Sequence, residues 1–553
     1  MPQNQSKTTS QRILSLIALE KEDISMVIVL TVGIGFLSLV SPIAVQMLVN
    51  IVTLGGVTQP LIVLSFILFI LLSLSGAIYV LEYYVVEHIQ RRVFVRVARE
   101  TSQTASQMPI IVYDNHNSVE LMNRFFDVST IQKATYILLT NGLMAVMQLV
   151  IGSIVLLFYS FYFAVIVFVI LIVSAFIVYI LGHHAAKYAI AESYAKYDMV
   201  AWLQTIAKNF HIFKFSHGHQ LAKNKTELLI SHYLHNRHQH FNLLLKQNIL
   251  AVIAYACAGT LLMAFGGLLV MRGEINLGQF VAAEFIIFGV LSAFISFVKK
   301  LETYYDMMAA VDKIGGIEDL QKENFKTHLI TLTHPINLTF NNVSYAYIPS
   351  RPVINNLSFS IQKGQSVAFY GADSSGKSTI CDLICALRQP TSGNILINNV
   401  DLRLVNFKSL REQIGLATDP EILQESILEN IRLFDESIPV YEIQTVLAGF
   451  NIDKEISFLP DGQDTLLTAN GSPLTLTYIR LLMIARALIN KPSLIVIDGL
   501  LDELSDTAIT EVLQFIKTYN AESTLIVLTN NETVARNCQQ VIKLTEFSGK
   551  DPS

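Results

Sequence analysis

Two short stretches of the sequence contain the residue types that bind a phosphorylated nucleotide. The first, "SVAFYGADSSGKSTI" (366–380), is an apolar run that leads through the pattern GxxxxGK[ST] into a helix-forming segment. Glycines let the backbone turn tightly, so that successive N–H groups face phosphate oxygens, and Lys377 can reach the outer phosphates. We therefore expect phosphate contacts from Gly371, Ser374, Ser375, Gly376, Lys377, Ser378 and Thr379.

The second stretch, "LIVIDGLLDELSD" (494–506), reads as a buried strand of four apolar residues that ends in Asp498. A strand that ends beside a phosphate loop can deliver a carboxylate to a magnesium ion held by that loop. The hydroxyl group of Ser378 is the matching ligand on the loop side. The sequence thus predicts a site for ATP, or at least a nucleoside triphosphate, with Mg²⁺ near Ser378 and Asp498.

The chain that contains this site is unusually rich in hydrophobic residues. Its 553 residues are 52% hydrophobic and 15% charged, with a mean hydropathy of +0.47, which is too apolar for a wholly soluble protein. The net charge of −5 offers no basic face for phosphate backbones and argues against nucleic-acid binding. Runs of roughly 20 apolar residues, enough to cross a bilayer, lie near 24–53, 61–86, 136–158, 161–182, 248–271 and 277–297.

The connections between these runs differ in length and charge. Segments 54–60 and 159–163 contain no Lys or Arg, whereas the long segments 87–135 and 183–247 contain many. The positive-inside rule therefore places the long segments and both termini in the cytoplasm. The long segments keep a helical pattern past any bilayer edge, so we expect a multi-pass protein of the inner (cytoplasmic) membrane with helical extensions into the cytoplasm.

A soluble α/β domain is expected to begin near residue 334, where strand-like runs and turn residues replace the long apolar runs. Within the membrane part, Glu284 stands roughly two turns into the last run and is predicted to line a cavity. The alternative is that this helix starts later and Glu284 lies near the interface. The expected divisions are an N-terminal cytoplasmic segment 1–23, a membrane domain 24–315, a linker 316–333 and a nucleotide-binding domain 334–548.

Six membrane helices with long cytoplasmic extensions, followed by a P-loop domain, resemble a half-transporter of the ATP-binding cassette (ABC) exporter family over nearly the whole chain. The stretch "VSYAY" (343–347) resembles the loop that stacks the adenine, which implies that Tyr347 is the stacking residue. "NRFFDVSTIQKA" (123–134) and "LGQFVAAE" (277–284) resemble bacterial exporters of the peptide and protein secretion type, in the group without a fused peptidase domain.

The resemblance implies an all-α membrane domain of six helices followed by an α/β P-loop NTPase (ABC) domain. It also implies a homodimer or heterodimer of half-transporters, surrounded by membrane lipids, that uses ATP and Mg²⁺. A periplasmic adaptor and an outer-membrane channel are suggested by the secretion-type resemblance.

The sequence departs from the family pattern at several catalytic positions. Aligned on "ARAL" (485–488), the signature LSGGQ falls on "LTLTY" (474–478), with Leu476 and Thr477 at the glycine positions. Neither suits a close approach of the backbone to a phosphate. Gly499 occupies the position of the glutamate that polarises the attacking water, and it cannot act as a base.

Two further switch positions also differ. Thr418 aligns with the glutamine that usually joins the magnesium to the membrane domain, and Asn530 aligns with the switch histidine. Asparagine can form hydrogen bonds, but it cannot carry a proton charge near neutral pH.

Two functions are consistent with this mixture of retained and missing residues. The first is an active exporter subunit with a slow or unconventional ATP cycle, in which Asp502, Glu503 or Glu425 supplies a replacement carboxylate. The second is a nucleotide-binding membrane subunit that gates or scaffolds a secretion complex without appreciable hydrolysis. ATP binding matters in both, and hydrolysis that depends on Lys377 discriminates between them.

Overall fold

The computed structural model describes residues 8–53, 58–115, 118–159, 161–323 and 336–544. The chain forms two compact units: the first contains the residues up to Lys322 except Pro109–Ile111, and the second contains Pro109–Ile111 and the residues from Glu323 onward. The first unit is helical and the second combines helices with two sheets. The expected fold class is confirmed.

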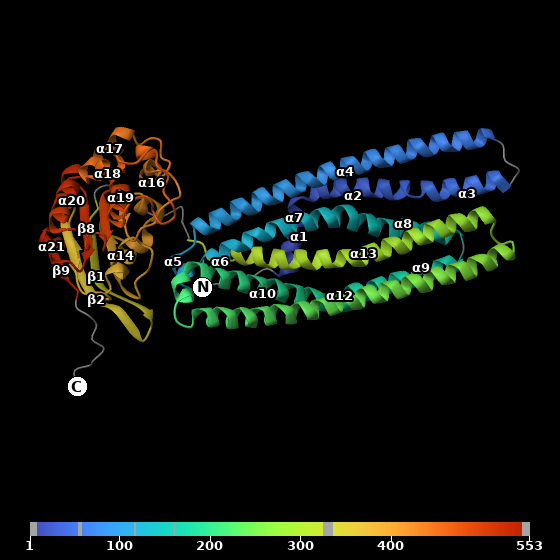
Figure 1. Cartoon of the computed structure of the whole chain (residues 1–553), viewed down its shortest axis with the longest axis horizontal. Helices are drawn as coiled ribbons and strands as arrows, with labels where there is room; N and C mark the ends of the chain where they lie inside the picture. Colours follow the sequence, from blue (N-terminus) through green and yellow to red (C-terminus); the bar gives the residue numbers. More distant parts are fainter. Residues whose placement is uncertain (1–7, 54–57, 116–117, 160, 324–335, 545–553) are drawn as a thin grey trace. The chain divides into compact units, whose positions relative to one another are not determined.

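Six segments of the described part of the first unit are long and apolar enough to cross a membrane: Lys21–Thr53, Thr58–Ser106, Glu120–Phe158, Val165–Lys208, Gly218–Met271 and Leu277–Glu318. Their long helices run side by side (Figure 1). The 54 residues of helix α12 correspond to a length of about 80 Å at 1.5 Å per residue. A bilayer core is about 30 Å thick, so this helix continues well beyond it, as the sequence pattern predicts.

The helices of the first unit follow one another with few interruptions. The start of helix α13 is set by its sequence. The Asn276 side chain accepts a hydrogen bond from the backbone N–H group of Gln279, and the Gln279 side chain accepts one from the backbone N–H group of Asn276. The elements are α1 Thr9–Leu19, α2 Lys21–Leu37, α3 Val40–Thr53, α4 Thr58–Ser106, α5 Ile110–Asn115, α6 Ser118–Asn123, η1 Arg124–Asp127, α7 Val128–Ile137, η2 Leu138–Gly142, α8 Leu143–Tyr159, α9 Phe161–Phe176, η3 Ile177–Leu181, α10 Gly182–Lys208, α11 Phe210–Lys214, α12 Gly218–Met271 and α13 Leu277–Glu318.

The second unit contains an antiparallel sheet and a parallel sheet. The antiparallel sheet has the order β2-β1-β4-β5, and the parallel sheet has the order β6-β7-β8-β3-β9. The strands are β1 Leu338–Ile348, β2 Arg351–Ile361, β3 Ser366–Tyr370, β4 Ser392–Ile397, β5 Val400–Asp401, β6 Ile414–Ala417, β7 Leu494–Asp498, β8 Thr524–Thr529 and β9 Gln540–Lys543. The helices are α14 Lys377–Ile384, η4 Leu402–Leu404, α15 Phe407–Arg411, α16 Ile427–Arg432, α17 Val440–Gly449, α18 Ile452–Ile456, η5 Gly462–Asp464, α19 Leu476–Leu488, α20 Asp506–Tyr519 and α21 Glu532–Arg536.

The parallel sheet brings the functional candidates to one edge. Its strands β7 and β8 are short runs of mainly Val, Ile and Leu because they lie buried inside the sheet. In the register of the sheet, Tyr370 pairs with Thr529, and Asp498 pairs with Leu528. The loops that follow β3, β7 and β8 therefore leave the sheet side by side, where ligands of open α/β sheets bind.

Candidate functional site

The phosphate loop follows strand β3. The N–H group of Gly371 donates to the carbonyl oxygen of Thr529 at 3.2 Å, which fixes the start of the loop to the end of β8. Ser374 and Gly376 have left-handed backbones, with φ of 67° and 91°, and helix α14 begins directly afterwards at Lys377. Glycine adopts this conformation without strain. The loop thus wraps onto a helix N-terminus, as the motif requires.

The loop faces a cavity of 680 Å³, lined by Tyr347, Arg351, Pro352, Val353 and residues 373–379. This is the size of a small-molecule site. The Nζ atom of Lys377 donates at 2.8 Å to the carbonyl oxygens of Gly371 and Ala372, so the lysine lies across the loop. Ser375 and Thr379 are buried at its base.

The expected magnesium side lies where β7 meets α14. The Asp498 carboxylate lies next to the Ser378 side chain. Burial raises the pKa of Asp498, and the Ser378 hydrogen bond and the Lys377 charge oppose this shift. A carboxylate and a hydroxyl oxygen beside a phosphate loop form a donor set that suits Mg²⁺, which takes one or two protein oxygens together with phosphate oxygens.

Tyr347, the expected adenine-stacking residue, lies at the rim of the same cavity. Its hydroxyl group is 3.2 Å from Thr379 Oγ1, and the Arg388 guanidinium lies 4.8 Å from the ring centroid. Arg388 is itself held by Asp382, with 2.8 Å between Nε and Oδ2. The ring is therefore fixed, yet it remains 51% exposed and open to stacking.

The loop after β7 contains a tight turn at the position of the missing glutamate. Gly499 has a φ of 69°, and the N–H group of Asp502 donates to its carbonyl oxygen at 3.2 Å. An added Cβ at Gly499 would meet no atom within 4 Å, so the glycine is required by the backbone conformation and not by crowding. The turn directs the chain back toward β8.

This turn places Asp502 against the end of β8. The Thr529 hydroxyl donates to Asp502 Oδ1, and the N–H group of Asn530 donates to Oδ2 at 3.1 Å. The Asn530 side chain donates in turn to Asp373 Oδ1 of the phosphate loop, also at 3.1 Å. Burial raises the pKa of Asp502, and the two hydrogen bonds oppose the shift. Asn530 therefore connects the Asp502 carboxylate to the phosphate loop.

The other two candidate carboxylates lie apart from this chain of contacts. Glu503 forms an ion pair with Arg480 of α19, and this pairing lowers the pKa of the exposed Glu503. Glu425 is exposed in the segment before α16. Of the three, Asp502 is the carboxylate joined to the phosphate loop, which neither its sequence position nor its residue type could indicate.

The signature segment keeps a helix N-terminus without glycines. Thr475 is the N-cap residue of α19, and its side chain forms no capping hydrogen bond within the described structure. Leu476, the first residue of the helix, is 53% exposed. The surface at the start of α19 is therefore partly apolar, while the helix dipole and the Thr475 hydroxyl group can still attract an anion. Thr418, in the expected glutamine position, directly follows strand β6.

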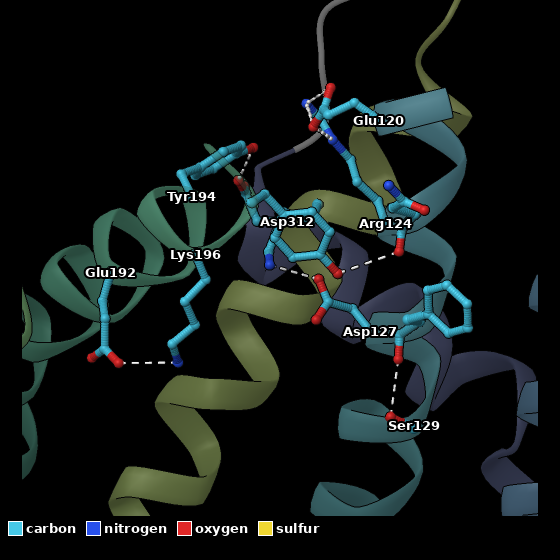
Figure 2. A network of polar contacts seen from close by, with 12 residues as sticks. Glu120, Arg124, Asp127, Ser129, Glu192, Tyr194, Lys196 and Asp312 are labelled. Carbon is cyan, nitrogen blue, oxygen red and sulfur yellow. Dashed lines mark hydrogen bonds and ion pairs between the residues drawn. The ribbon is translucent and has the colours of Figure 1, made fainter. Parts of the chain in front are cut away.

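In the membrane unit, Glu284 lies on α13 and is partly buried, so its cavity role stays a prediction. Sequence reasoning missed a larger polar network on α10, η1 and α13 (Figure 2). There the fully buried Lys313 has its Nζ atom 2.7 Å from Asp127 Oδ2 and 3.7 Å from the centroid of the Tyr197 ring. The Tyr194 hydroxyl donates to Asp312 at 3.2 Å.

Comparison with known proteins agrees with both units. The ABC transporter transmembrane region matches residues 24–294, and the ABC transporter family matches residues 354–501. The chain contains a transmembrane region and an ABC domain of the ABC transporter family. It is a multi-pass membrane protein with six transmembrane helices, and its ABC domain implies ATP binding.

The curated relatives match part of this chain. It is 27% identical to the "Toxin RTX-I translocation ATP-binding protein" of Actinobacillus pleuropneumoniae, over 50% of the chain and 40% of the relative. It is 25% identical to the "Alpha-hemolysin translocation ATP-binding protein HlyB" of Proteus vulgaris over the same shares. It is 27% identical to the uncharacterized ABC transporter protein YfiC of Bacillus subtilis, over 51% of the chain and 48% of the relative. The matched segment is thus less than half of each relative.

One solved structure matches nearly the whole chain in fold. It is a bacterial Atm1-family ABC exporter with ATP bound, with a TM-score of 0.83 and 19% sequence identity, over 96% of this chain and 94% of the other. At this identity the likeness concerns the fold. It bears on the arrangement of six long helices and an α/β domain, not on the cargo.

Proposed function

We propose that this half-transporter uses ATP to export a peptide, a protein or another amphipathic substrate from the cytoplasm across the inner membrane, with a slow or non-standard hydrolysis cycle. The observation that carries this proposal is the connection from the phosphate loop through Asn530 to Asp502. It supplies a carboxylate beside a complete phosphate-binding loop. The secretion-type names of two relatives support the substrate class.

Each part of the site would have its own task. Bound ATP supplies the phosphoanhydride bond whose cleavage drives the cycle. The loop N–H groups and Lys377 bind phosphate oxygens, and the oxygens of Ser378 and Asp498 hold the metal. Tyr347 offers a partly exposed aromatic face for the adenine.

Asp502 would accept the proton of the attacking water. A base must be near its own pKa at the working pH, and burial raises the pKa of Asp502 toward that range. Thr529 and Asn530 hold both carboxylate oxygens, so the group is oriented in advance. Asn530 would therefore serve as the residue that positions Asp502, a task that needs an amide and no proton charge.

The test is steady-state ATP hydrolysis by the purified full chain in lipid, with Mg²⁺, beside the variant Lys377→Ala. We expect the wild-type chain to hydrolyse ATP and the Lys377→Ala variant to have lost this activity. Turnover of the wild-type chain that is no faster than that of Lys377→Ala, although the wild type binds ATP, would reject an active cycle in this chain.

A second function is favoured by Gly499, Asn530 and Leu476, which put no glutamate, histidine or glycine at the usual catalytic positions. In that case the chain is a nucleotide-binding membrane subunit that gates or scaffolds a secretion complex. ATP would then stabilise it by mass action without turnover. Its signature is a Tm that rises with ATP concentration in the wild type, a rise that needs higher ATP concentrations in Lys377→Ala, and no hydrolysis in either.

Both functions include partners. One membrane region and one ABC domain per chain support a homodimer or a heterodimer of half-transporters. A periplasmic adaptor and an outer-membrane channel are proposed partners of the secretion type, and both termini are proposed to be cytoplasmic. Pull-down of the tagged full chain from membranes tests the adaptor, and labelling of single cysteines near each terminus in intact and opened cells tests the orientation.

A further inference from the structure

A second acidic residue of the membrane unit is more deeply buried than Glu284. Glu82 lies on α4, close to the cytoplasmic end of the second apolar run, and is 2% exposed. It contacts Thr31 of α2, which is fully buried. An ionisable side chain at such a place in a membrane protein is costly and marks a candidate functional site.

The hydrogen bonds around Thr31 favour a protonated Glu82. The Thr31 Oγ1 atom lies within donating distance of two acceptors, 2.8 Å from the carbonyl oxygen of Val27 and 2.8 Å from Oε1 of Glu82. The hydroxyl group has one hydrogen, and the carbonyl oxygen of Val27 can only accept, so one hydrogen cannot serve both contacts fully. The second contact then needs a hydrogen from Glu82. Both contacts are hydrogen bonds when Glu82 is a carboxylic acid, whereas an ionised Glu82 would leave two acceptors competing for one hydrogen.

The groups around Glu82 also favour its protonated form. None of the ion pairs formed by the described residues includes Glu82. Its neighbours are phenol groups: Tyr79 and Tyr83 on its own helix and Tyr136 on α7. Along α2 and α4, Asp23 pairs with Arg92 and Glu87 pairs with Arg91, and on α7 Lys133 lines the same groove as Tyr136.

Another buried carboxylate of the same unit shows what an ionised group requires. Glu192 on α10 is 3% exposed, like Glu82, but its oxygens meet Lys196 Nζ at 3.0 Å, Arg237 Nη1 at 3.4 Å and His240 Nδ1 at 2.9 Å. Paired cations compensate the burial of a charge, whereas a single hydroxyl group does not.

A path for a proton reaches this region. An open groove of 520 Å³ between α4 and α7 is lined by Tyr83, Glu87, Gln90, Ser129, Gln132, Lys133, Tyr136 and Ile137. The rings of Tyr83 and Tyr136 meet edge to face, 5.8 Å apart, at the groove wall. Polar side chains thus extend from the groove to the phenols beside Glu82.

We propose that Glu82 is a proton-binding site of the membrane unit and that the contact between α2 and α4 closes around its protonated form. When this contact opens, the O–H bond of the Glu82 carboxyl group breaks, its proton passes to water in the groove, and a solvated carboxylate remains. The membrane unit therefore couples its conformation to a proton, independently of whether the ABC domain hydrolyses ATP.

Infrared spectroscopy of the full chain in lipid nanodiscs tests the site, because a protonated carboxyl group has its own C=O stretching band. Near neutral pH we expect a band that is lost in Glu82→Gln and kept in the matched control Glu192→Gln. A band that is unchanged in Glu82→Gln overturns the proposal.

The pH dependence of stability tests the coupling in the same samples. A group that is protonated in the folded chain stabilises it at low pH, and this contribution is lost as the pH rises. The Glu82→Gln variant keeps a hydrogen-bonding side chain that cannot ionise. We expect the Tm of the wild type to fall relative to that of Glu82→Gln as the pH increases. A difference that does not change with pH overturns the coupling, even where the infrared band supports the site.

Discussion

The phosphate loop and the ends of strands β7 and β8 belong to one site, but they differ in how closely they follow the ABC family. The loop between β3 and α14 has the residues, the left-handed turns and the helix N-terminus that phosphate binding needs. The ends of β7 and β8 instead carry Gly499 and Asn530, and they are joined through a third residue, Asp502.

Under the proposed function, binding and hydrolysis make separate demands on the chain. Phosphate binding relies on backbone N–H groups and one lysine, whose geometry comes from the turn itself. Hydrolysis relies on one side chain in one place, and that side chain can be moved if the backbone moves with it. Gly499 provides such a change, since its left-handed turn brings Asp502 to Thr529.

The largest expected effect concerns Asp502. Replacing it in Asp502→Asn keeps the size of the side chain but turns one acceptor oxygen into an NH2 donor and removes the base. We expect the hydrolysis rate to fall by roughly 10²- to 10⁴-fold, with ATP affinity unchanged, as measured by steady-state turnover and equilibrium binding.

The matched control is Glu503→Gln, which removes an exposed carboxylate of the neighbouring residue. It should leave turnover close to that of the wild type. Equal losses in the two variants would mean that the loop is merely sensitive to change, and the difference between Asp502 and its neighbour would disappear.

Lys377→Ala should act on the other half of the site. It removes a charged hydrogen-bond donor worth about 1.5–3 kcal/mol, so we expect ATP to bind roughly 10- to 150-fold more weakly. Equilibrium binding to the full chain in lipid measures this. Asp502→Asn serves as the reference, and a variant pair in which both change binding equally would show that the two halves are not separable.

The pH dependence of hydrolysis sharpens the role of Asp502. A base acts when ionised, and burial raises the pKa of Asp502, so hydrolysis should fall as the pH falls through that raised pKa. The decrease is about tenfold per pH unit below it. Burial also raises the pKa of Asp498, but extra Mg²⁺ should offset protonation there.

A rate profile recorded at saturating Mg²⁺ should therefore show the acid-side decrease in the wild type and not in the residual activity of Asp502→Asn. A decrease that extra Mg²⁺ removes entirely would assign the titration to Asp498.

Replacing Gly499 should have a smaller effect, which concerns the stability of the chain. In Gly499→Glu a residue with a side chain must adopt a φ near 69°, which costs roughly 1–2 kcal/mol. Asparagine tolerates this conformation better, so Gly499→Asn is the matched control. We expect the Tm of the full chain to be lower for Gly499→Glu than for Gly499→Asn, with no gain in hydrolysis. A faster Gly499→Glu enzyme with unchanged Tm would show that the turn is not needed.

The sequence was sufficient for the parts of the fold that depend on local patterns. The phosphate motif, the strand that ends at Asp498 and the six apolar runs follow from residue order, and they fix the class of each unit. Choosing among Asp502, Glu503 and Glu425 required tertiary contacts, because all three are acidic residues in loops.

The same limit applies to the membrane unit. Glu284 and Glu82 both interrupt apolar runs, and the sequence could not show that Glu82 is the more deeply buried of the two. Burial depends on which face of the helix meets its neighbours, and the partner of Glu82, Thr31, lies 51 residues away in the chain. A long-range contact of this kind leaves no signal in local periodicity.

The smallest expected effect is at the adenine end of the phosphate side. Tyr347→Phe keeps the ring and its contact with Arg388 but removes the hydroxyl group near Thr379, a bond worth about 0.5–1.5 kcal/mol. Because the ring carries the stacking, we expect ATP affinity to fall by roughly 2- to 10-fold or less, and Tyr347→Ala to lose more. If Tyr347→Phe and Tyr347→Ala weaken binding equally, the hydroxyl group and not the ring holds the nucleotide. The adenine end would then depend on one hydrogen bond, just as the proposed hydrolysis depends on one carboxylate. The two halves of the site would in that case differ less than the geometry of the phosphate loop indicates.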